Sequence, residues 1–240
     1  MNPSSCKNCD APLGQQSDFC SHCGQAAHVH RLDMPHIMHE VVHAVIHADK
    51  GIFHLMKLMA LRPGIVVKEY VAGKRKKYFN PFNFLVLSVA VSTFVTGYFH
   101  LMDMAPEAPN KASALINKHI NLIFFVAVPV SALFSWLLFR KSGYNYAENL
   151  TLHAFLGGFR IVFFLFLFTP LIVFYREYYY LMLGLYMAIW VAFSTWAFYQ
   201  FYGGKLYVVT LKSLLTLFLT QVTITLFISL MLWIYFMFLT

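Results

Sequence analysis

The stretch LTLHAFLGGFRIVFFLFLFTPLIVF, from Leu150 to Phe174, contains one charged residue in 25. A helix needs about 20 such apolar residues to cross the hydrocarbon core of a bilayer. Four other runs are similarly apolar: Phe82 to Met102, His119 to Phe139, Tyr178 to Tyr199 and Val209 to Phe238. The sequence therefore predicts an all-α polytopic membrane protein with about five transmembrane helices in residues 82–240.

The composition of the whole chain agrees with a membrane protein. Of the 240 residues, 59% are hydrophobic and 12% are charged, which leaves too little polar surface to cover a soluble globule. The chain carries 18 Lys and Arg against 10 Asp and Glu. Beside membrane spans, excess basic residues set topology and contact headgroups, so we expect membrane lipids and no nucleic acid as partners.

All four cysteines form two Cys-x-x-Cys pairs near the N-terminus, Cys6 with Cys9 and Cys20 with Cys23. Each pair can direct two thiolates at one ion, and four thiolates complete a closed tetrahedral zinc site. Gly24, directly after the second pair, suits a turn with positive φ. We predict a small N-terminal zinc ribbon in residues 1–30, with structural Zn as its cofactor. A rubredoxin-like iron site and redox-active cysteines are the alternatives.

The N-terminus and the basic residues predict the sidedness. The N-terminal residues lack the basic and apolar regions of a signal peptide, so we expect the first span to direct insertion and the ribbon to stay in the reducing cytosol. Basic residues precede the first span and recur at Arg140, Lys141, Lys205 and Lys212. This alternation predicts a cytoplasmic N-terminus and an external C-terminus.

Residues 31–81 are predicted to form a cytoplasmic helical segment at the membrane interface. An amphipathic helix is expected from Met34 or Pro35 to Leu61, and Gly51 could interrupt it. One face carries His36, His39, His43, His47, Lys50, His54 and Lys57. The opposite face carries Val41, Val45, Ile52, Leu55 and Met59. Such a helix can lie on the cytoplasmic leaflet with its imidazoles toward water or headgroups.

The histidine face also matches a metalloprotease pattern. His39, Glu40 and His43 satisfy H-E-x-x-H, in which two histidines four residues apart bind one ion. With His47, the two histidines are candidate ligands of a second metal. The spans offer two candidates for a further ligand, Glu148 and His153. Because short patterns arise by chance in histidine-rich segments, the interfacial interpretation is preferred.

A second, shorter helix is expected after the break at residues 62–64. It would begin at Pro63, run to Ala72 and end at Gly73. The basic run that follows is predicted to contact anionic lipid: Lys74, Arg75, Lys76 and Lys77. Aromatic residues from Tyr78 to Phe82 then lead into the first span.

Several short motifs occur in a characteristic order: Cys20-Ser-His-Cys-Gly-Gln25, Arg62-Pro-Gly64, Glu69-Tyr70, Gly73-Lys-Arg75 and Tyr78-x-x-Pro81-Phe82. Together they resemble an uncharacterised bacterial membrane family, the domain of unknown function 3667. The resemblance is clearest from the ribbon through the first span and extends loosely to residues 146–149. It implies a zinc-ribbon protein in the inner membrane of Gram-negative bacteria, and it implies no known activity.

Polar residues inside the spans are functional candidates because each is costly in hydrocarbon without a partner. Arg160 lies well inside the third span and on nearly the same helical face as His153. Gly157 and Gly158 lie between them and allow close approach of another helix or a ligand. We expect Arg160 to face the bundle interior and to pair with Gln221. Bundle packing, binding of a headgroup or anion, and a permeation path are the three interpretations.

Three functional classes follow. The preferred class is a non-enzymatic membrane protein, without catalytic residues, whose ribbon docks a cytosolic protein while the bundle binds lipid or a protein partner; it could be an oligomer. The second class is a channel, transporter or pore that uses the polar site around Arg160. The third is a metal-dependent membrane enzyme built on His39, Glu40 and His43. The closed metal site and the lack of an acid–base constellation favour the first class.

Overall fold

The computed structural model describes residues 5–14, 17–35, 37, 51–98, 112, 115–116 and 119–238. Its elements in chain order are α2 (Ile52–Leu61), α3 (Pro63–Val71), α4 (Pro81–Tyr98), α6 (Ile120–Leu138), the 3-10 turn η2 (Arg140–Ser142), α7 (Tyr146–Phe163), the π-helical turn η3 (Phe164–Phe168), α8 (Thr169–Phe174), the 3-10 turn η4 (Arg176–Tyr178), α9 (Tyr179–Tyr202) and α10 (Leu206–Phe238). The described residues are mostly helical, as predicted, and contain two isolated β-bridges but no strand.

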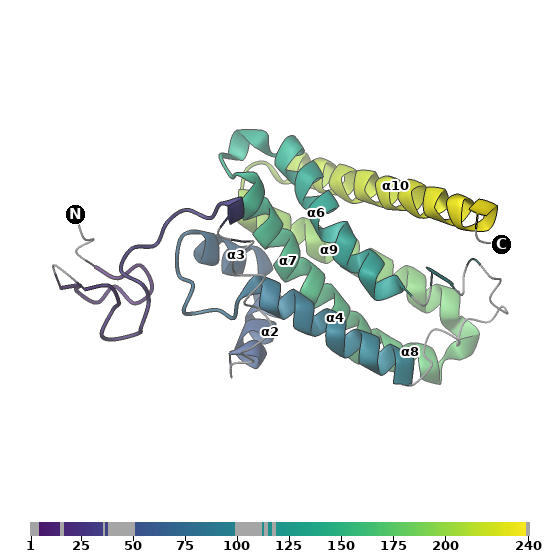
Figure 1. The fold of residues 1–240 in the computed structure, drawn as a ribbon, viewed down its shortest axis with the longest axis horizontal. Coiled ribbons are helices and arrows are strands. Elements are labelled where there is room, and N and C mark those ends of the chain that lie inside the picture. Colours follow the sequence, from purple (N-terminus) through teal and green to yellow (C-terminus); the bar gives the residue numbers. More distant parts are fainter. Residues whose placement is uncertain are drawn as a thin grey trace.

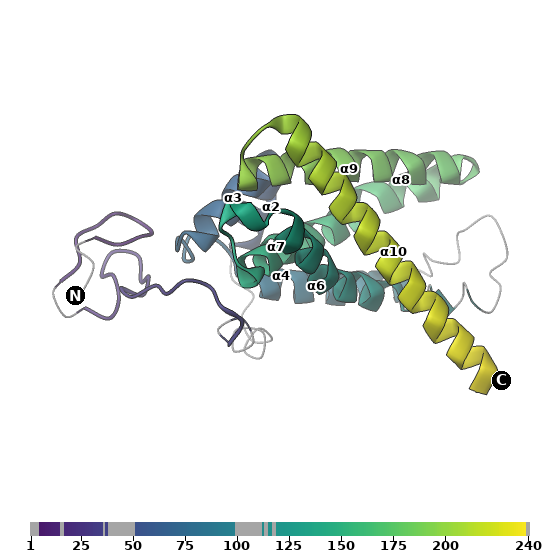
Figure 2. The same ribbon diagram turned by 90° about the horizontal axis from the view of Figure 1, so that it is seen from above.

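The long helices run along the long axis of the molecule (Figure 1). The central helix α7 packs against α4 and α6, whereas α10 crosses obliquely over α6 and α9 (Figure 2). The N-terminal segment, α2 and α3 gather at one end of the bundle, and α10 finishes at the opposite end (Figures 1 and 2). These two ends are called the ribbon end and the far end below.

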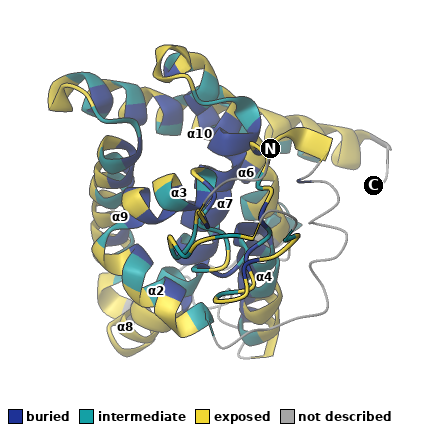
Figure 3. Cartoon of the chain, turned by 90° about the vertical axis from the view of Figure 1, so that its left-hand side faces the viewer, coloured by how far each residue is buried: buried dark blue, intermediate teal, exposed yellow. Residues whose placement is uncertain are grey.

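Among the described residues, four helical segments are long and apolar enough to cross a membrane. They are Pro81–Tyr98, Tyr146–Leu171, Tyr179–Tyr202 and Leu206–Met237. The other predicted span coincides with α6, whose apolar part, Leu122–Leu138, is shorter. Seen from the ribbon end, α7 is buried, while exposed residues lie on the outward faces of α9 and α10 (Figure 3). An apolar exterior of this kind is compatible with a bilayer as its solvent.

A capping box sets the first residue of α7. The side chain of Asn145 accepts the N–H of Glu148, and the Glu148 carboxylate accepts the N–H of Asn145, both at 2.8 Å. The helix therefore begins at Tyr146, earlier than the predicted Leu150, because hydropathy does not register polar capping residues. At 1.5 Å per residue, Arg160 lies about 21 Å beyond Tyr146. It is close to the middle of the span Tyr146–Leu171.

The short helices agree with their predictions where the structure describes them. Helix α2 begins directly after Gly51, and its buried residues are Leu55 and Met59, both on the predicted apolar face. Helix α3 begins at Pro63 and is followed by Gly73, whose φ is 111°. The two helices contact each other at the ribbon end.

Glycines allow two close helix contacts. A Cβ on Gly158 of α7 would lie 2.7 Å from Cδ1 of Phe84 in α4, which confirms that the predicted glycine pair admits a neighbouring helix. In α3, the N–H of Gly64 donates to Oε1 of Gln200 in α9 at 2.9 Å. A Cβ on Gly64 would lie 2.7 Å from the backbone nitrogen of Phe201. Helix α3 thus docks on α9 with no room for a side chain.

We predict that Gly64→Ala lowers the stability of the detergent-solubilised protein by roughly 1–3 kcal/mol, because the added methyl group meets backbone that cannot move cheaply. Thermal melting would measure the loss. Gly184→Ala is the matched control, since a Cβ at Gly184 of α9 has nothing within 4 Å. Equal melting temperatures for the two variants would contradict the close α3–α9 contact.

Candidate metal centre and polar sites

The two Cys-x-x-Cys pairs form turns with the same hydrogen bonds. In the first turn, the N–H of Cys6 donates to the carbonyl of Ala11, and the carbonyl of Cys6 accepts from Asp10, both at 2.9 Å. In the second turn, the N–H of Cys20 donates to the carbonyl of Gln25, and the carbonyl of Cys20 accepts from the N–H of Gly24, both at 2.8 Å. Asp10 in the first turn and Gly24 in the second hold equivalent positions, and their backbone φ angles are 59° and 69°. The two turns are therefore structural repeats that present their sulfurs alike.

The four sulfurs converge on one point. All four Sγ atoms lie within 4.8 Å of one another. The separation is 3.6 Å between Cys6 and Cys23 and 3.7 Å between Cys9 and Cys20. A tetrahedron with metal–sulfur bonds of about 2.3 Å has edges of about 3.8 Å. The cluster can therefore hold a single metal ion in a closed, four-sulfur shell.

Hydrogen-bond donors point at the sulfurs. The N–H of Asn8 lies 3.4 Å from Sγ of Cys6. Burial would raise the pKa of the Cys23 thiol, but the N–H of Gln25, the side chain of Asn8 and the thiols of Cys9 and Cys6 act on its sulfur and lower the pKa to about 6. In Cys9 a backbone bond to Ala11 would lower the pKa, but burial and the other three thiols raise it, so the negative charge of the cluster is held chiefly by Cys23. Donors to sulfur stabilise the thiolate over the thiol. Since thiolates are the metal-binding form, these turns suit a cation.

The ribbon is attached to the loop between α3 and α4. Oε1 of Gln25 accepts the N–H of Lys76 at 2.9 Å. Arg75 donates to the carbonyl of His30 at 2.7 Å. The position of the cysteine cluster relative to the bundle is therefore set by specific hydrogen bonds.

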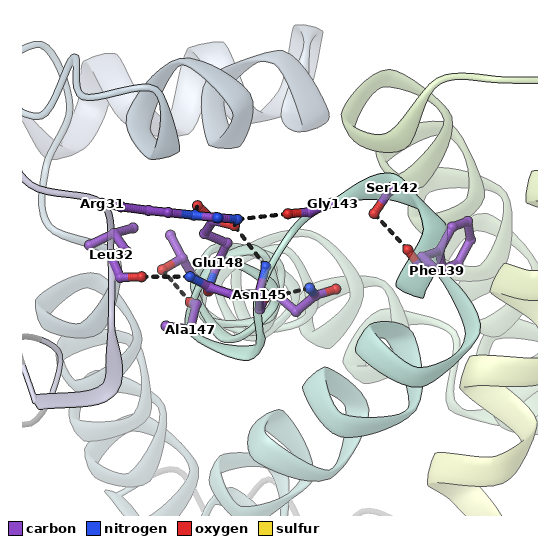
Figure 4. Close-up of polar contacts among 10 residues, drawn as sticks. Arg31, Leu32, Phe139, Ser142, Gly143, Asn145, Ala147 and Glu148 are labelled. Carbon is purple, nitrogen blue, oxygen red and sulfur yellow. Dashed lines mark hydrogen bonds and ion pairs between the residues drawn. The ribbon is translucent and has the colours of Figure 1, made fainter.

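A second attachment joins the residues after the ribbon to the start of α7 (Figure 4). The guanidinium of Arg31 donates to both carboxylate oxygens of Glu148 and to the carbonyl of Gly143, each at 2.7 Å. Asn145 donates to the carbonyl of Leu32 at 2.8 Å. The hydrogen bonds and charge of Glu148 raise the pKa of Arg31. The Glu148 side chain is only 4% exposed, so its carboxylate depends on these partners.

The basic run of residues 74–77 also has partners within the protein. Lys77 donates to Oε2 of Glu69 at 2.6 Å, and the hydroxyl of Tyr78 donates to the same oxygen. Burial would raise the pKa of Glu69, but these two donors hold it below its ordinary value. Lys77, together with Arg75, thus fixes the loop before α4. Lipid contact by the run stays a prediction.

His153 belongs to a buried polar network that joins α6, α7 and α9. Its Nε2 lies 2.9 Å from the hydroxyl of Ser135, and that hydroxyl lies 3.1 Å from Oδ1 of Asn149. The hydroxyl of Tyr202 donates to the same amide oxygen, and the amide nitrogen donates to the carbonyl of Asn145 at 2.7 Å. These mutual bonds support the packing interpretation for His153.

Arg160 faces the bundle interior, as predicted. Its Nε donates to the hydroxyl of Tyr186 at 3.0 Å. Its guanidinium carbon lies 4.9 Å, 5.8 Å and 5.3 Å from the ring centres of Phe124, Tyr186 and Trp190. Aromatic faces attract a cation at these distances. The guanidinium therefore occupies an aromatic enclosure built by α6 and α9.

The expected pairing of Arg160 with Gln221 is wrong. Gln221 is exposed on α10, and its Nε2 lies 3.3 Å from the hydroxyl of Thr225 on the same helix. Thr220, the preceding residue, is buried. Successive residues point about 100° apart around a helix, so burying Thr220 turns Gln221 outward. The sequence showed a polar side of this span but not its rotation.

The histidine face lies almost entirely outside the described residues. This applies to His36, His39, Glu40, His43, His47 and Lys50. The H-E-x-x-H match and the second metal site are therefore untested. His54, which the structure does describe, is exposed.

The sequence analysis missed the contact of Arg31 with Glu148. Its detectable signal was Asn145-x-x-Glu148 directly before an apolar run, a capping-box pattern. The partners Ser135, Tyr202 and Tyr186 carry no local signal, because each meets its partner through tertiary packing.

We predict that Arg31→Ala lowers stability by about 1–3 kcal/mol, because it leaves the buried Glu148 carboxylate short of donors. Limited proteolysis should then cut residues 28–33 faster than in the parent protein. Lys141→Ala, which removes an exposed charge at the same end, should change neither property. Unchanged proteolysis and melting in Arg31→Ala would show that this attachment contributes nothing.

Comparisons with curated proteins and with solved structures find no match. Over residues 49–93, from before α2 into α4, the chain matches the model of a family described as Protein of unknown function (DUF3667), the family that the motifs resemble.

Proposed function

We propose that this chain is an integral protein of a bacterial inner membrane that holds one structural Zn²⁺. The cysteine cluster carries this proposal, because its four sulfurs lie within 4.8 Å of one another and fit a tetrahedron. Zinc with four thiolate ligands has no open position for substrate or water. The ion would therefore stabilise the ribbon, which is too short to bury a core of its own, and would not perform chemistry.

The ribbon acts as a non-enzymatic docking element for a cytosolic protein. It is fixed to the bundle through the contacts of Gln25, Arg75 and Arg31. Its second turn leaves the ring of Phe19 66% exposed. Aromatic residues on a rigid surface are typical anchors of protein interfaces. A metal-fixed turn that carries an exposed ring thus suits a protein partner.

The ribbon end faces the cytosol in this proposal, and α2 lies on the inner leaflet. Phe53 and Leu61 of α2 are 78% and 61% exposed. Exposed apolar residues beside basic ones are typical of a helix at the headgroup level. The reversals at the ribbon end carry Arg140, Lys141 and Lys205, whereas η4 at the far end carries one basic and one acidic residue. This distribution supports a cytoplasmic ribbon.

We predict one tightly bound zinc per chain in protein purified without chelator, measured by elemental analysis. The double substitution Cys20→Ser and Cys23→Ser should remove the zinc, while circular dichroism shows an unchanged helical bundle. His39→Ala and His43→Ala should keep it, because imidazoles at the interface need no ion. Absence of zinc from the parent protein would refute the proposal. A second metal equivalent lost with either histidine would favour the enzyme class.

We also predict five passes through the membrane, with the N-terminus inside and the C-terminus outside. Reporter fusions at Asn110, between α4 and α6, and after Thr240 should both report the external side, while a fusion before Met1 reports the cytosol. A cytosolic signal from the Thr240 fusion would mean that α6, with its shorter apolar stretch, does not cross the bilayer.

A further inference from the structure

A small cavity lies inside the bundle between α6, α7, α9 and α10. Its volume is about 60 Å³. By the same measure, one water molecule needs about 10–15 Å³, so the space admits a few atoms but no lipid headgroup with its chains. The polar residues that line it are Ser131, His153, Arg160 and Ser194, and the other lining residues are apolar. Within the part of the chain that the structure describes, no carboxylate contributes to its walls.

Arg160 brings to this cavity a positive charge that no carboxylate of the described residues compensates. Residues 119–238 contain two carboxylates, Glu148 and Glu177. Glu148 is bound by Arg31, and Glu177 is exposed in η4 at the far end. The partners that the structure shows for the guanidinium are the hydroxyl of Tyr186, the sulfur of Met187 at 3.8 Å and the ring faces. A cation near the middle of a span is costly without a counter-charge, which an anion in the cavity would supply.

Ser194 provides an independent observation. Its side chain is 1% exposed, and its Oγ has no hydrogen-bond partner among the described residues. Buried hydroxyls are almost always hydrogen-bonded. Ser194 lies one helical turn from Trp190, whose ring faces Arg160, and both line the cavity. A hydroxyl that lacks an acceptor thus shares a small space with a guanidinium that lacks a counter-charge.

We propose that this cavity binds one monovalent anion of halide size, chloride being the abundant one, between the guanidinium of Arg160 and the hydroxyl of Ser194. One positive charge matches one negative charge, and the volume selects a small ion. A water molecule could accept from Ser194 but would leave the charge of Arg160 unbalanced. The site is independent of the metal centre, which lies outside the bundle at the ribbon end (Figure 1).

The test uses the full-length protein in a neutral detergent, at constant ionic strength, with gluconate exchanged stepwise for chloride or bromide. A ligand that binds only the folded state raises the melting temperature in a saturable way. Arg160→Gln should abolish this rise. Ser194→Ala should weaken halide affinity by about tenfold, the effect of losing a hydrogen bond to an ion.

A second measurement follows the ion at the site itself. With Trp136, Trp196 and Trp233 replaced by Phe, Trp190 is the remaining tryptophan. Bromide should then quench its fluorescence saturably, with the dissociation constant found by melting. The matched control belongs to the melting experiment, in protein that keeps all four tryptophans: it is Arg140→Gln, because Arg140 is an exposed arginine that also lies over a ring, 5.4 Å from the centre of Trp136. This variant should respond to halide as the parent protein does.

Three outcomes would overturn the proposal. One is a halide response that is equal in Arg160→Gln and the parent protein. Another is an equal rise in melting temperature with sulfate, which would indicate unspecific charge screening. The third outcome applies if Arg160→Gln does not fold. In that case, halide affinity that is unchanged in Ser194→Ala, together with Trp190 quenching that rises linearly with bromide, would show that no ion binds in the cavity.

Discussion

The carboxylate of Glu148 is the constraint on which the arrangement of this protein depends. It accepts the N–H of Asn145 and so fixes where α7 begins. It also accepts the bidentate guanidinium of Arg31 and so fixes the segment that leads from the ribbon. A buried carboxylate is tolerated only when such donors satisfy it, which makes the ribbon and the central helix mutually dependent. One side chain thereby links the N-terminal segment that carries the cysteines to the helical bundle.

The start of α7 determines what its inner face presents to the other helices. Asn149 and His153, one turn apart, meet α6 and α9 through Ser135 and Tyr202 near the ribbon end. Arg160 lies two turns further on the same side, at the depth of Tyr186. A helix that began four residues later would bring Arg160 about 6 Å closer to the headgroups, since each residue advances the helix by about 1.5 Å. The cap therefore sets the depth of the intramembrane charge.

The sequence predicted the features that depend on composition and local spacing. Apolar runs located the long helices, the two Cys-x-x-Cys pairs predicted the convergent sulfurs, and Gly73 predicted the end of α3. The sequence did not predict the contacts that depend on how a helix is rotated or on which helices pack together. Gln221 shares a helix with buried threonines but points away from them, and the rings around Arg160 come from two other helices. Local sequence patterns do not encode such tertiary contacts, because the rotation of a helix is set by the helices that pack against it.

In a bilayer, close backbone contacts and polar bonds would determine helix packing more than apolar burial does. Lipid tails are as apolar as leucine, so burying an apolar side chain between helices gains little over leaving it in lipid. Specific association must then come from close backbone contacts and polar bonds. Gly158 admits α4 onto α7, and Gly64 admits α3 onto α9 with its N–H bonded to Gln200. The polar network around Asn149 joins α6 to these helices.

Helix α10 is mostly exposed, but the hydroxyl of Ser213 lies 2.8 Å from that of Thr195 in α9, and Lys212 donates to the carbonyl of Leu138 at 2.7 Å. These hydrogen bonds near the ribbon end, together with the buried side chains of Val209, Thr216 and Ile224, hold α10 against α6 and α9.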